Sequence, residues 1–125
     1  MTFTLVQVAL GGAIGAVLRY LTGVGAVRWL GIGFPWGTLI VNIAGSFSMG
    51  VIVVMLAHLS GNRFAPLLMT GLLGGFTTFS AFSLDAATLY ERGDVGLAAG
   101  YVLASVVLSI AALFAGLLLA RSFAT

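Results

Sequence analysis

The stretch "GGFTTFSAFSLD", from Gly74 to Asp85, places two glycines, several hydroxyls and three phenylalanines in the middle of an apolar run. The run carries no charge from Phe64 to Leu84, which is long enough to cross a bilayer as a helix. A backbone group that loses its hydrogen bond in hydrocarbon costs several kcal/mol unless protein, water or an ion satisfies it. We therefore predict that the helix breaks at Gly74 and Gly75, and that the break is a binding site.

A helix break of this kind carries partial charges of both signs. The segment that ends near Leu73 presents carbonyl oxygens with partial negative charge, and the segment that begins near Thr77 presents amides with partial positive charge. The break can therefore coordinate a small cation through the carbonyl oxygens of Gly74 and Thr77. The same geometry favours an anion near the amides.

Aromatic and hydroxyl side chains follow the break. Phe79 and Phe82 are three residues apart and share a helix face, which Asp85 continues. Aromatic rings are positive at the edge, so phenylalanines presented edge-on can contact an anion without trapping it; alternatively, these rings only pack or face lipid. Ser80 and Ser83 offer hydroxyls to a ligand, or they only bond to the carbonyl one turn earlier. Asp85 is the one acid within a span, unless it marks the aqueous end of its helix.

Two other segments carry stripes of neutral hydrogen-bonding side chains. Thr38 and Asn42 are one turn apart, and Tyr101, Ser105 and Ser109 repeat every four residues, so each set lies on one helix face. Neutral donors in a row suit the path of an anion. Asn42 can instead join two helices through a hydrogen bond.

The composition is that of a membrane protein. The chain is 61% hydrophobic and 6% charged, whereas soluble domains carry about 25% charged residues. The few charges separate four uncharged blocks, each able to supply the roughly 20 apolar residues of a spanning helix. We predict an all-α protein with one domain over residues 1–125, polar turns, and spans at about 3–24, 36–58, 66–90 and 96–120.

Small residues and arginines constrain how these spans assemble. Gly11 and Gly15 in the first span, and Gly71 and Gly75 in the third, have the four-residue spacing that lets membrane helices approach closely. The pI near 9.7 rests on five arginines spread between spans, which suits lipid headgroups, topology or an anion rather than a nucleic acid. Arg19, late in the first span, either anchors at the interface or faces a wet vestibule. Cysteine is absent, so thiolate catalysis and zinc clusters are excluded.

The arginines give almost no orientation signal. Four spans put both termini and the second loop on one side of the membrane, with Arg63 and Arg121. The first and third loops lie on the other side, with Arg28 and Arg92, and Arg19 is near that side. A split of 2 to 3 cannot choose an orientation by the positive-inside rule. A chain that inserts both ways can form an antiparallel homodimer.

The sequence resembles the Fluc, or CrcB, family of bacterial fluoride channels. The stretches that carry the resemblance are "GGAIGAVLRY", "PWGTLIVNIAGS", "GLLGGFTTFSAFSLD" and "YVLASVVLS", one in each span. The family implies a channel rather than an enzyme, which exports cytoplasmic fluoride passively across the bacterial inner membrane. It also implies an antiparallel, dual-topology homodimer with two fluoride pores and one buried structural sodium ion on the two-fold axis.

By position, the resemblance assigns roles to individual residues. The sodium ligands would be the backbone carbonyls of Gly74 and Thr77. The pore or its mouth would be formed by Asn42, Phe79, Phe82, Ser80, Ser83, Thr38, Tyr101, Ser105 and Ser109, with Arg19 near a vestibule. Two positions depart from the family pattern: Ala81 replaces a common hydroxyl, and Asp85 replaces a common glutamate, which shortens the reach of a carboxylate.

Two other classes of protein have four spans. A proton-coupled small multidrug transporter needs a carboxylate deep in its first span, and this chain has none there. A non-conducting structural subunit would need no polar stripes. Proton-coupled fluoride flux would favour the transporter, and absence of flux the structural subunit.

Overall fold

The structure, a computed structural model, describes residues 1–59 and 62–124 and is helical throughout its ordered elements. Residues 60 and 61, in the predicted turn after the second span, lie outside the described residues. The elements are α1 (Thr2–Leu30), α2 (Trp36–His58), the π-helix η1 (Pro66–Leu73), α3 (Gly74–Phe76), α4 (Ser80–Glu91) and α5 (Val95–Ala124).

Four helical segments are long and apolar enough to cross a membrane, as predicted: Thr2–Leu30, Trp36–His58, Pro66–Glu91 and Val95–Phe123. The first span continues to Leu30 instead of ending near residue 24, because glycines within it stay helical. Gly31, with φ 84°, ends α1, and Gly93, with φ 91°, follows α4. Both turns need the left-handed backbone that glycine adopts without strain.

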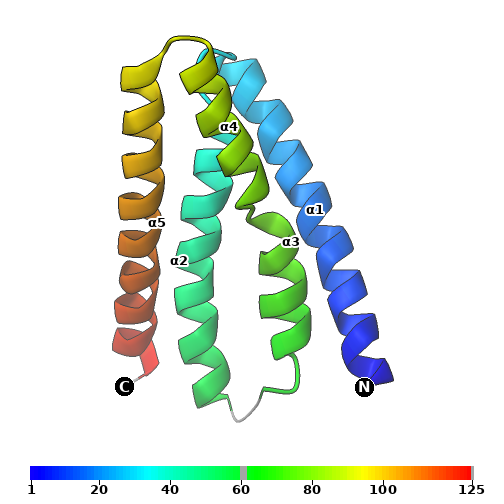
Figure 1. Ribbon diagram of the computed structural model, residues 1–125. Helices are drawn as coiled ribbons and strands as arrows, with labels where there is room; N and C mark the ends of the chain where they lie inside the picture. The colour runs from blue at the N-terminus through cyan, green and yellow to red at the C-terminus, as the bar shows by residue number, and fades with distance from the viewer. Residues whose placement is uncertain (60–61, 125) are drawn as a thin grey trace.

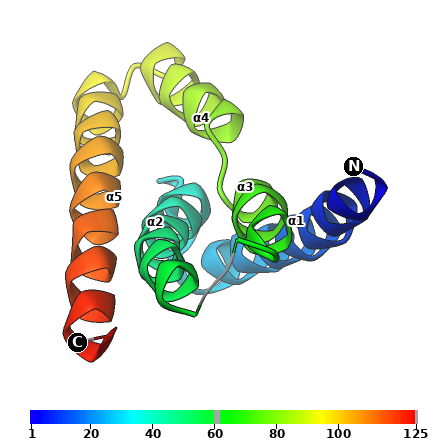
Figure 2. The same ribbon diagram turned by 90° about the horizontal axis from the view of Figure 1, so that it is seen from below.

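The helices lie side by side along one long axis, and both termini are at the same end (Figure 1). The third span changes its neighbour halfway. Its first half, η1 and α3, packs on α1, whereas its second half, α4, packs on α5. The view along the axis shows α4 displaced from α3 toward α5 (Figure 2). A break in this span is therefore what lets one segment contact two helices on opposite sides of the bundle.

Glycines bring α1 and the third span into backbone contact, as the four-residue spacing predicts. A Cβ atom added to Gly15 would lie 2.1 Å from the carbonyl oxygen of Leu72, and one added to Gly75 would lie 2.7 Å from that of Gly12. Gly11 and Gly71 meet in the same way one turn earlier. At these crossings the space between the two helices holds the hydrogen atoms of glycine and no larger side chain.

The predicted position of the break is wrong. Gly74 is helical, with φ −63° and ψ −37°, and Gly75 lies within α3. The helix instead ends at Phe76, where Thr77 turns extended with φ −86° and ψ 161°. Gly75 is used for packing on α1, whereas a Cβ atom on Gly74 would meet only Met69 of the same span, and in hydrocarbon no water competes for the backbone hydrogen bonds of either residue. The preceding turns are widened: the Gly74 amide donates to Met69, five residues back.

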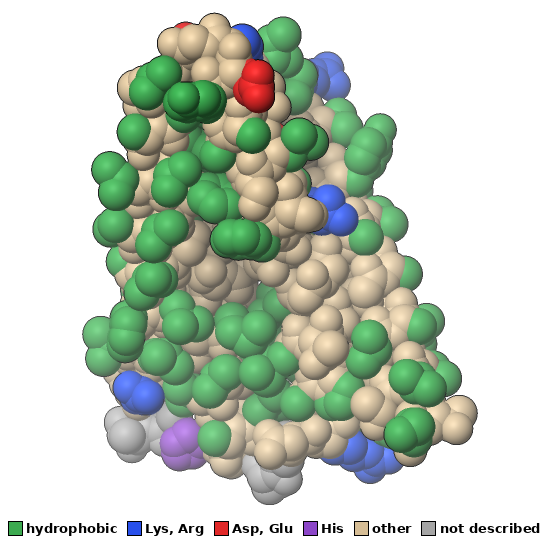
Figure 3. Space-filling model, viewed as in Figure 1, with side chains coloured by type: hydrophobic (Ala, Val, Ile, Leu, Met, Phe, Trp, Pro, Cys, Tyr) green, Lys and Arg blue, Asp and Glu red, His purple; other side chains and the backbone are tan. Residues whose placement is uncertain are grey.

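Large apolar side chains are exposed along the length of α1 and α5, at both ends of α2, and in the third span from Phe79 onward. Figure 3 shows this apolar surface on one face of the molecule, with charged side chains gathered mainly toward its two ends. A surface of this kind suits contact with lipid.

The glycine contacts generate the first prediction. Gly15→Ala should destabilise the protein by about 1–3 kcal/mol, the usual cost of overpacking. The new methyl group would meet backbone atoms of Leu72 and Gly75, which cannot move aside as a flexible side chain can. Thermal unfolding of the purified protein in detergent measures this effect. Gly12→Ala is the matched control, since its new methyl group meets no atom within 4 Å. Equal unfolding midpoints for the two variants would contradict the proposed crossing.

Candidate functional site

Asn42 on α2 binds the extended backbone at the break. Its Nδ2 donates to the carbonyl oxygen of Thr78 at 2.9 Å, and the Thr78 amide donates to its Oδ1 at 2.8 Å. One side-chain amide thus satisfies both backbone polar groups of the residue in the middle of the break. These two groups would otherwise each cost several kcal/mol in hydrocarbon.

The break releases the two carbonyl groups that the sequence singles out. In a continuous helix, the amides of Thr78 and Ala81 would donate to the carbonyls of Gly74 and Thr77, four residues earlier. Here the Thr78 amide donates to Asn42, and the Ala81 amide donates to the Thr78 hydroxyl at 3.1 Å. Both carbonyl oxygens are therefore freed from the helical pattern at the end of a helix, where carbonyls carry partial negative charge.

A groove of about 560 Å³ opens beside the break, between α2, the third span and α5. Ser105 is 6% exposed, and the hydroxyl oxygens of Ser105 and Ser109 are buried without a hydrogen-bond partner. Buried hydroxyls normally have a partner, so these two are open to a ligand. The predicted residues that the groove brings together are Asn42, Gly74, Thr77, Phe79, Phe82, Ser105 and Ser109.

The two phenylalanines differ in their surroundings. Their ring centroids are 5.4 Å apart with an interplanar angle of 50°. Phe82 is 9% exposed and packs on the Tyr101 ring at 5.3 Å, whereas Phe79 is 77% exposed at the middle of the span. The Phe79 ring therefore projects from the wall of the groove, and Phe82 forms part of the core behind it.

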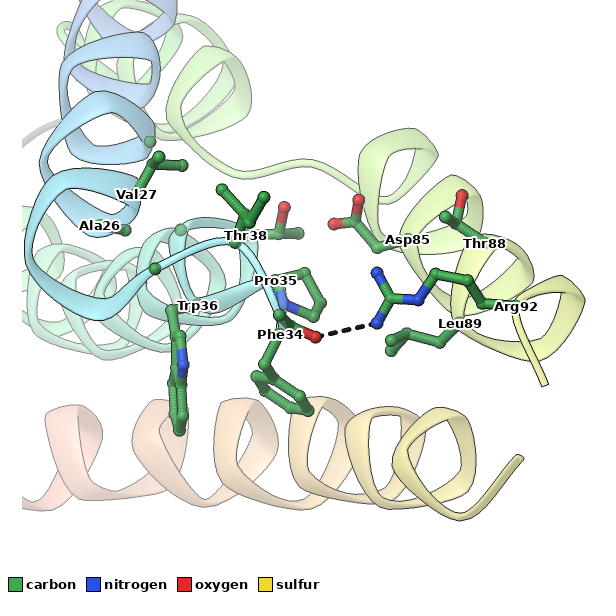
Figure 4. Close-up of a pocket in the computed structure, with 15 residues that line it drawn as sticks. Ala26, Val27, Phe34, Pro35, Trp36, Thr38, Asp85, Thr88, Leu89 and Arg92 are labelled. Atoms are coloured by element: carbon green, nitrogen blue, oxygen red, sulfur yellow. Dashed lines mark hydrogen bonds between the residues drawn. The ribbon is translucent and has the colours of Figure 1, made fainter. Parts of the chain in front are cut away.

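Tyr101 is fully buried and donates its hydroxyl to Asp85 Oδ2 at 3.2 Å. Asp85 also lines a cavity of about 290 Å³ near the loop that joins α1 and α2. Figure 4 shows Asp85 of α4 and Arg92, which directly follows α4, pointing into this cavity, with Thr38 of α2 facing them. Arg92 donates to the Gly33 carbonyl oxygen at 3.0 Å and pairs with Asp94 at 2.9 Å, so the mouth of the cavity is polar.

A third cavity, of about 680 Å³, lies between α1, α2 and the break, and Arg19 lines it. The cavities share walls: Thr38 lines this one and the mouth cavity, and Thr78 lines this one and the groove. Arg19 lies deeper than its predicted place near a loop, because α1 continues to Leu30. Its Nε donates to the Gly75 carbonyl oxygen at 3.1 Å.

Four predicted pore residues do not line the groove: Thr38, Tyr101, Ser80 and Ser83. Ser80 and Ser83 are exposed, and Ser83 donates to the Phe79 carbonyl oxygen at 3.0 Å, which is the alternative bond one turn back. Ser80 and Thr78 share a hydrogen bond between their hydroxyls at 3.2 Å. Neither serine lines any of these three cavities.

Sequence reasoning assigned no role to three residues that the structure singles out: Thr78, Ser46 and Gln7. The Thr78 hydroxyl accepts a hydrogen bond from the amide of Ala81, three residues later. A threonine in this position before a helix is a capping pattern that the sequence shows. Ser46 lines the groove, and it continues the stripe of Thr38 and Asn42 at the same four-residue spacing. Gln7, in the first span, is buried, with 5% exposure. The sequence indicates this residue only in that it is an amide among apolar residues.

Comparison with known proteins identifies the family of this chain. Residues 6–117 match the family described as CrcB-like protein, Camphor Resistance. The chain belongs to the CrcB family. It is 66% identical over 123 residues, 98% of both chains, to a protein of Cereibacter sphaeroides named fluoride-specific ion channel FluC. Proteins of that name are 58% identical in Paracoccus denitrificans, over 97% of both chains, and in Agrobacterium fabrum, over 92% of this chain and 94% of that protein. The chain is thus a multi-pass protein of a bacterial inner membrane.

The close contact of α2 with the break generates a second prediction for this CrcB protein. A Cβ atom on Gly45 would lie 2.1 Å from Thr77 Cγ2. Thr77 cannot rotate away freely, because its hydroxyl donates to the Leu73 carbonyl oxygen at 2.8 Å. Gly45→Ala should therefore cost about 1–3 kcal/mol, measured as a lower midpoint of thermal unfolding in detergent.

A double variant tests whether this contact is the cause. Thr77→Ser removes Cγ2 and keeps the hydroxyl, so it should change the midpoint little. Combined with Gly45→Ala, it should restore most of the lost stability. Additive losses in the double variant would show that the methyl group of Thr77 is not what excludes a side chain at Gly45.

Proposed function

We propose that this protein is a fluoride-selective passive ion channel that exports cytoplasmic fluoride. The observation that carries the proposal is the groove at mid-span, where two buried hydroxyls without partners face a phenylalanine pair beside freed backbone groups. The groove is lined by neutral side chains, which suits an ion that must enter and leave rapidly. Relatives named as fluoride-specific channels, at up to 66% identity, support the same conclusion.

The chemistry of fluoride explains why such a groove is suited to it. Fluoride is small and strongly hydrated, so a narrow path must replace its water with hydroxyl and amide donors. Ser105 and Ser109 supply hydroxyls, and the edges of Phe79 and Phe82 supply weak positive charge. Asn42 positions the break, since its amide already binds Thr78. Tyr101 and Thr38 lie along the path toward the mouth cavity.

The channel is a homodimer of antiparallel copies with two pores. The groove beside Phe79 is open on one side and holds the hydroxyls of Ser105 and Ser109, and leaving such groups open to lipid is unfavourable unless a second copy covers them. The exposed hydroxyls of Ser80 and Ser83 would then face this partner. The nearly even distribution of arginines between the two sides, Arg63 and Arg121 against Arg28 and Arg92 with Arg19 nearby, favours insertion in both orientations.

A structural sodium ion fits the break. The carbonyl oxygens of Gly74 and Thr77 are hard ligands of the type that such cations take, and both are released from helical hydrogen bonds. They lie at the negative end of a half-helix. A bound sodium ion would supply the positive charge that stabilises this end.

Fluoride efflux from liposomes tests the function. Phe79→Ile and Phe82→Ile keep apolar bulk but remove the ring edge, so each should slow efflux by about tenfold, the effect of a barrier about 1.4 kcal/mol higher. Asn42→Asp should slow it at least as strongly, because it loses the donor to Thr78 and places a carboxylate beside the groove. Phe76→Ile, in a ring outside the groove lining, is the control and should change efflux little.

Three outcomes would contradict the channel proposal. Chloride passing as fast as fluoride would remove the selectivity, and absence of flux from well-assembled protein would favour a structural subunit. Fluoride flux that carries protons in fixed ratio would favour the transporter.

Dual topology is tested by cysteine labelling. Asn62 is exposed, and the chain has no native cysteine, so Asn62→Cys gives a single reactive thiol. A membrane-impermeant maleimide should label about half of the protein from each side of the membrane. Two lysines added beside Arg63 should shift this ratio and lower fluoride efflux. Labelling of the parent from one side alone would exclude an antiparallel dimer.

A further inference from the structure

Arg19 holds a charge in the middle of a membrane span. It is half-buried, and within the described residues no acid lines its cavity. A guanidinium at this depth is costly without an acceptor. Its acceptor is the Gly75 carbonyl oxygen, 3.1 Å from Nε, one residue before α3 ends at Phe76. The charge of Arg19 is therefore placed at the negative end of a half-helix.

Close packing makes this contact possible. Arg19 lies one turn after Gly15, whose missing side chain lets α1 touch the backbone of Leu72. Helical side chains point back toward the N-terminus of their helix, so Arg19 reaches toward the level of Gly75. Because Gly75 has no side chain, no side-chain contact can hold its backbone in place. The bond from Arg19 is a cross-helix contact that fixes the direction of its carbonyl group.

We propose that Arg19 is a positioning residue for the sodium ligands. Gly75 lies between Gly74 and Thr77 in the chain, so a fixed Gly75 carbonyl restrains the short turn from which both ligand carbonyls project. Without Arg19 this turn can relax, and the two carbonyl oxygens lose their alignment. The inference rests on the sodium site proposed above, and it assigns to Arg19 a role in backbone geometry instead of anion attraction.

Arg19 has a second effect of opposite sign. As a cation near a bound cation, it repels sodium, so its removal would strengthen sodium binding if charge alone mattered. If positioning dominates, its removal weakens sodium binding. The direction of the change therefore separates the two roles.

The experiment is a sodium titration of thermal unfolding in detergent, with N-methylglucamine replacing sodium at constant ionic strength. Arg19→Gln should raise the sodium concentration that gives half of the maximal stabilisation by about tenfold, as expected for loss of a hydrogen bond from a charged group. Arg19→Lys should stay within about threefold of the parent, because Arg19 uses a single donor here and no bidentate contact. Arg28→Gln, at an exposed position on the same helix, should leave the titration unchanged.

An unchanged or lower half-saturating concentration in Arg19→Gln would overturn the proposal. Should Arg19→Gln fail to assemble in saturating sodium, Arg19→Met, which has similar reach and no donor, takes its place with the same expected shift. A parent protein without sodium dependence would overturn both this inference and the sodium site. The fluoride efflux assay would then still decide the channel function independently.

Discussion

The two hydrogen bonds between Asn42 and the backbone of Thr78 support the rest of this structure. A membrane span with an extended residue at its centre is unstable unless its backbone groups find partners inside the protein. Because Asn42 supplies both partners, the third span can stop packing on α1 at Phe76 and resume on α5 from Ser80. The groove beside the break is a consequence of this change of neighbour.

Small residues make that pairing possible. Asn42 reaches Thr78 because α2 lies close to the break, and Gly45 permits this approach, since any side chain there would collide with Thr77. On the other side, Gly15 and Gly75 hold α1 against the third span. In lipid, where helices gain little from hydrophobic burial, such contacts supply much of the association energy. Glycines therefore permit close packing on both sides of the break, although the helix is not interrupted at any of these glycines.

The spans and most of the groove could be predicted from the sequence, and the break could be predicted only roughly. Uncharged blocks predict membrane helices because charge is excluded from hydrocarbon, and four-residue spacing placed Asn42, Ser105 and Ser109 on faces that meet. The Gly74 and Gly75 pair predicted the wrong position, because helix propensity measured in water does not apply where glycine packs against a neighbouring backbone. Ser80 and Ser83 lie outside the groove, since a face assigned by spacing depends on the direction of α4, which the break resets.

The charged and neutral groups around the break have separate places, and this separation follows from what an ion path requires. Arg19 and Asp85 line the two other cavities, whereas the groove presents hydroxyls, ring edges and backbone. A full charge in the groove would either trap an anion or repel it, and both slow its passage. A full charge at the end of a half-helix instead stabilises the carbonyls that the break exposes. The break therefore needs positive charge on its α1 side and neutral donors on its α5 side, and the change of neighbour in the third span supplies both from a single interruption of the helix.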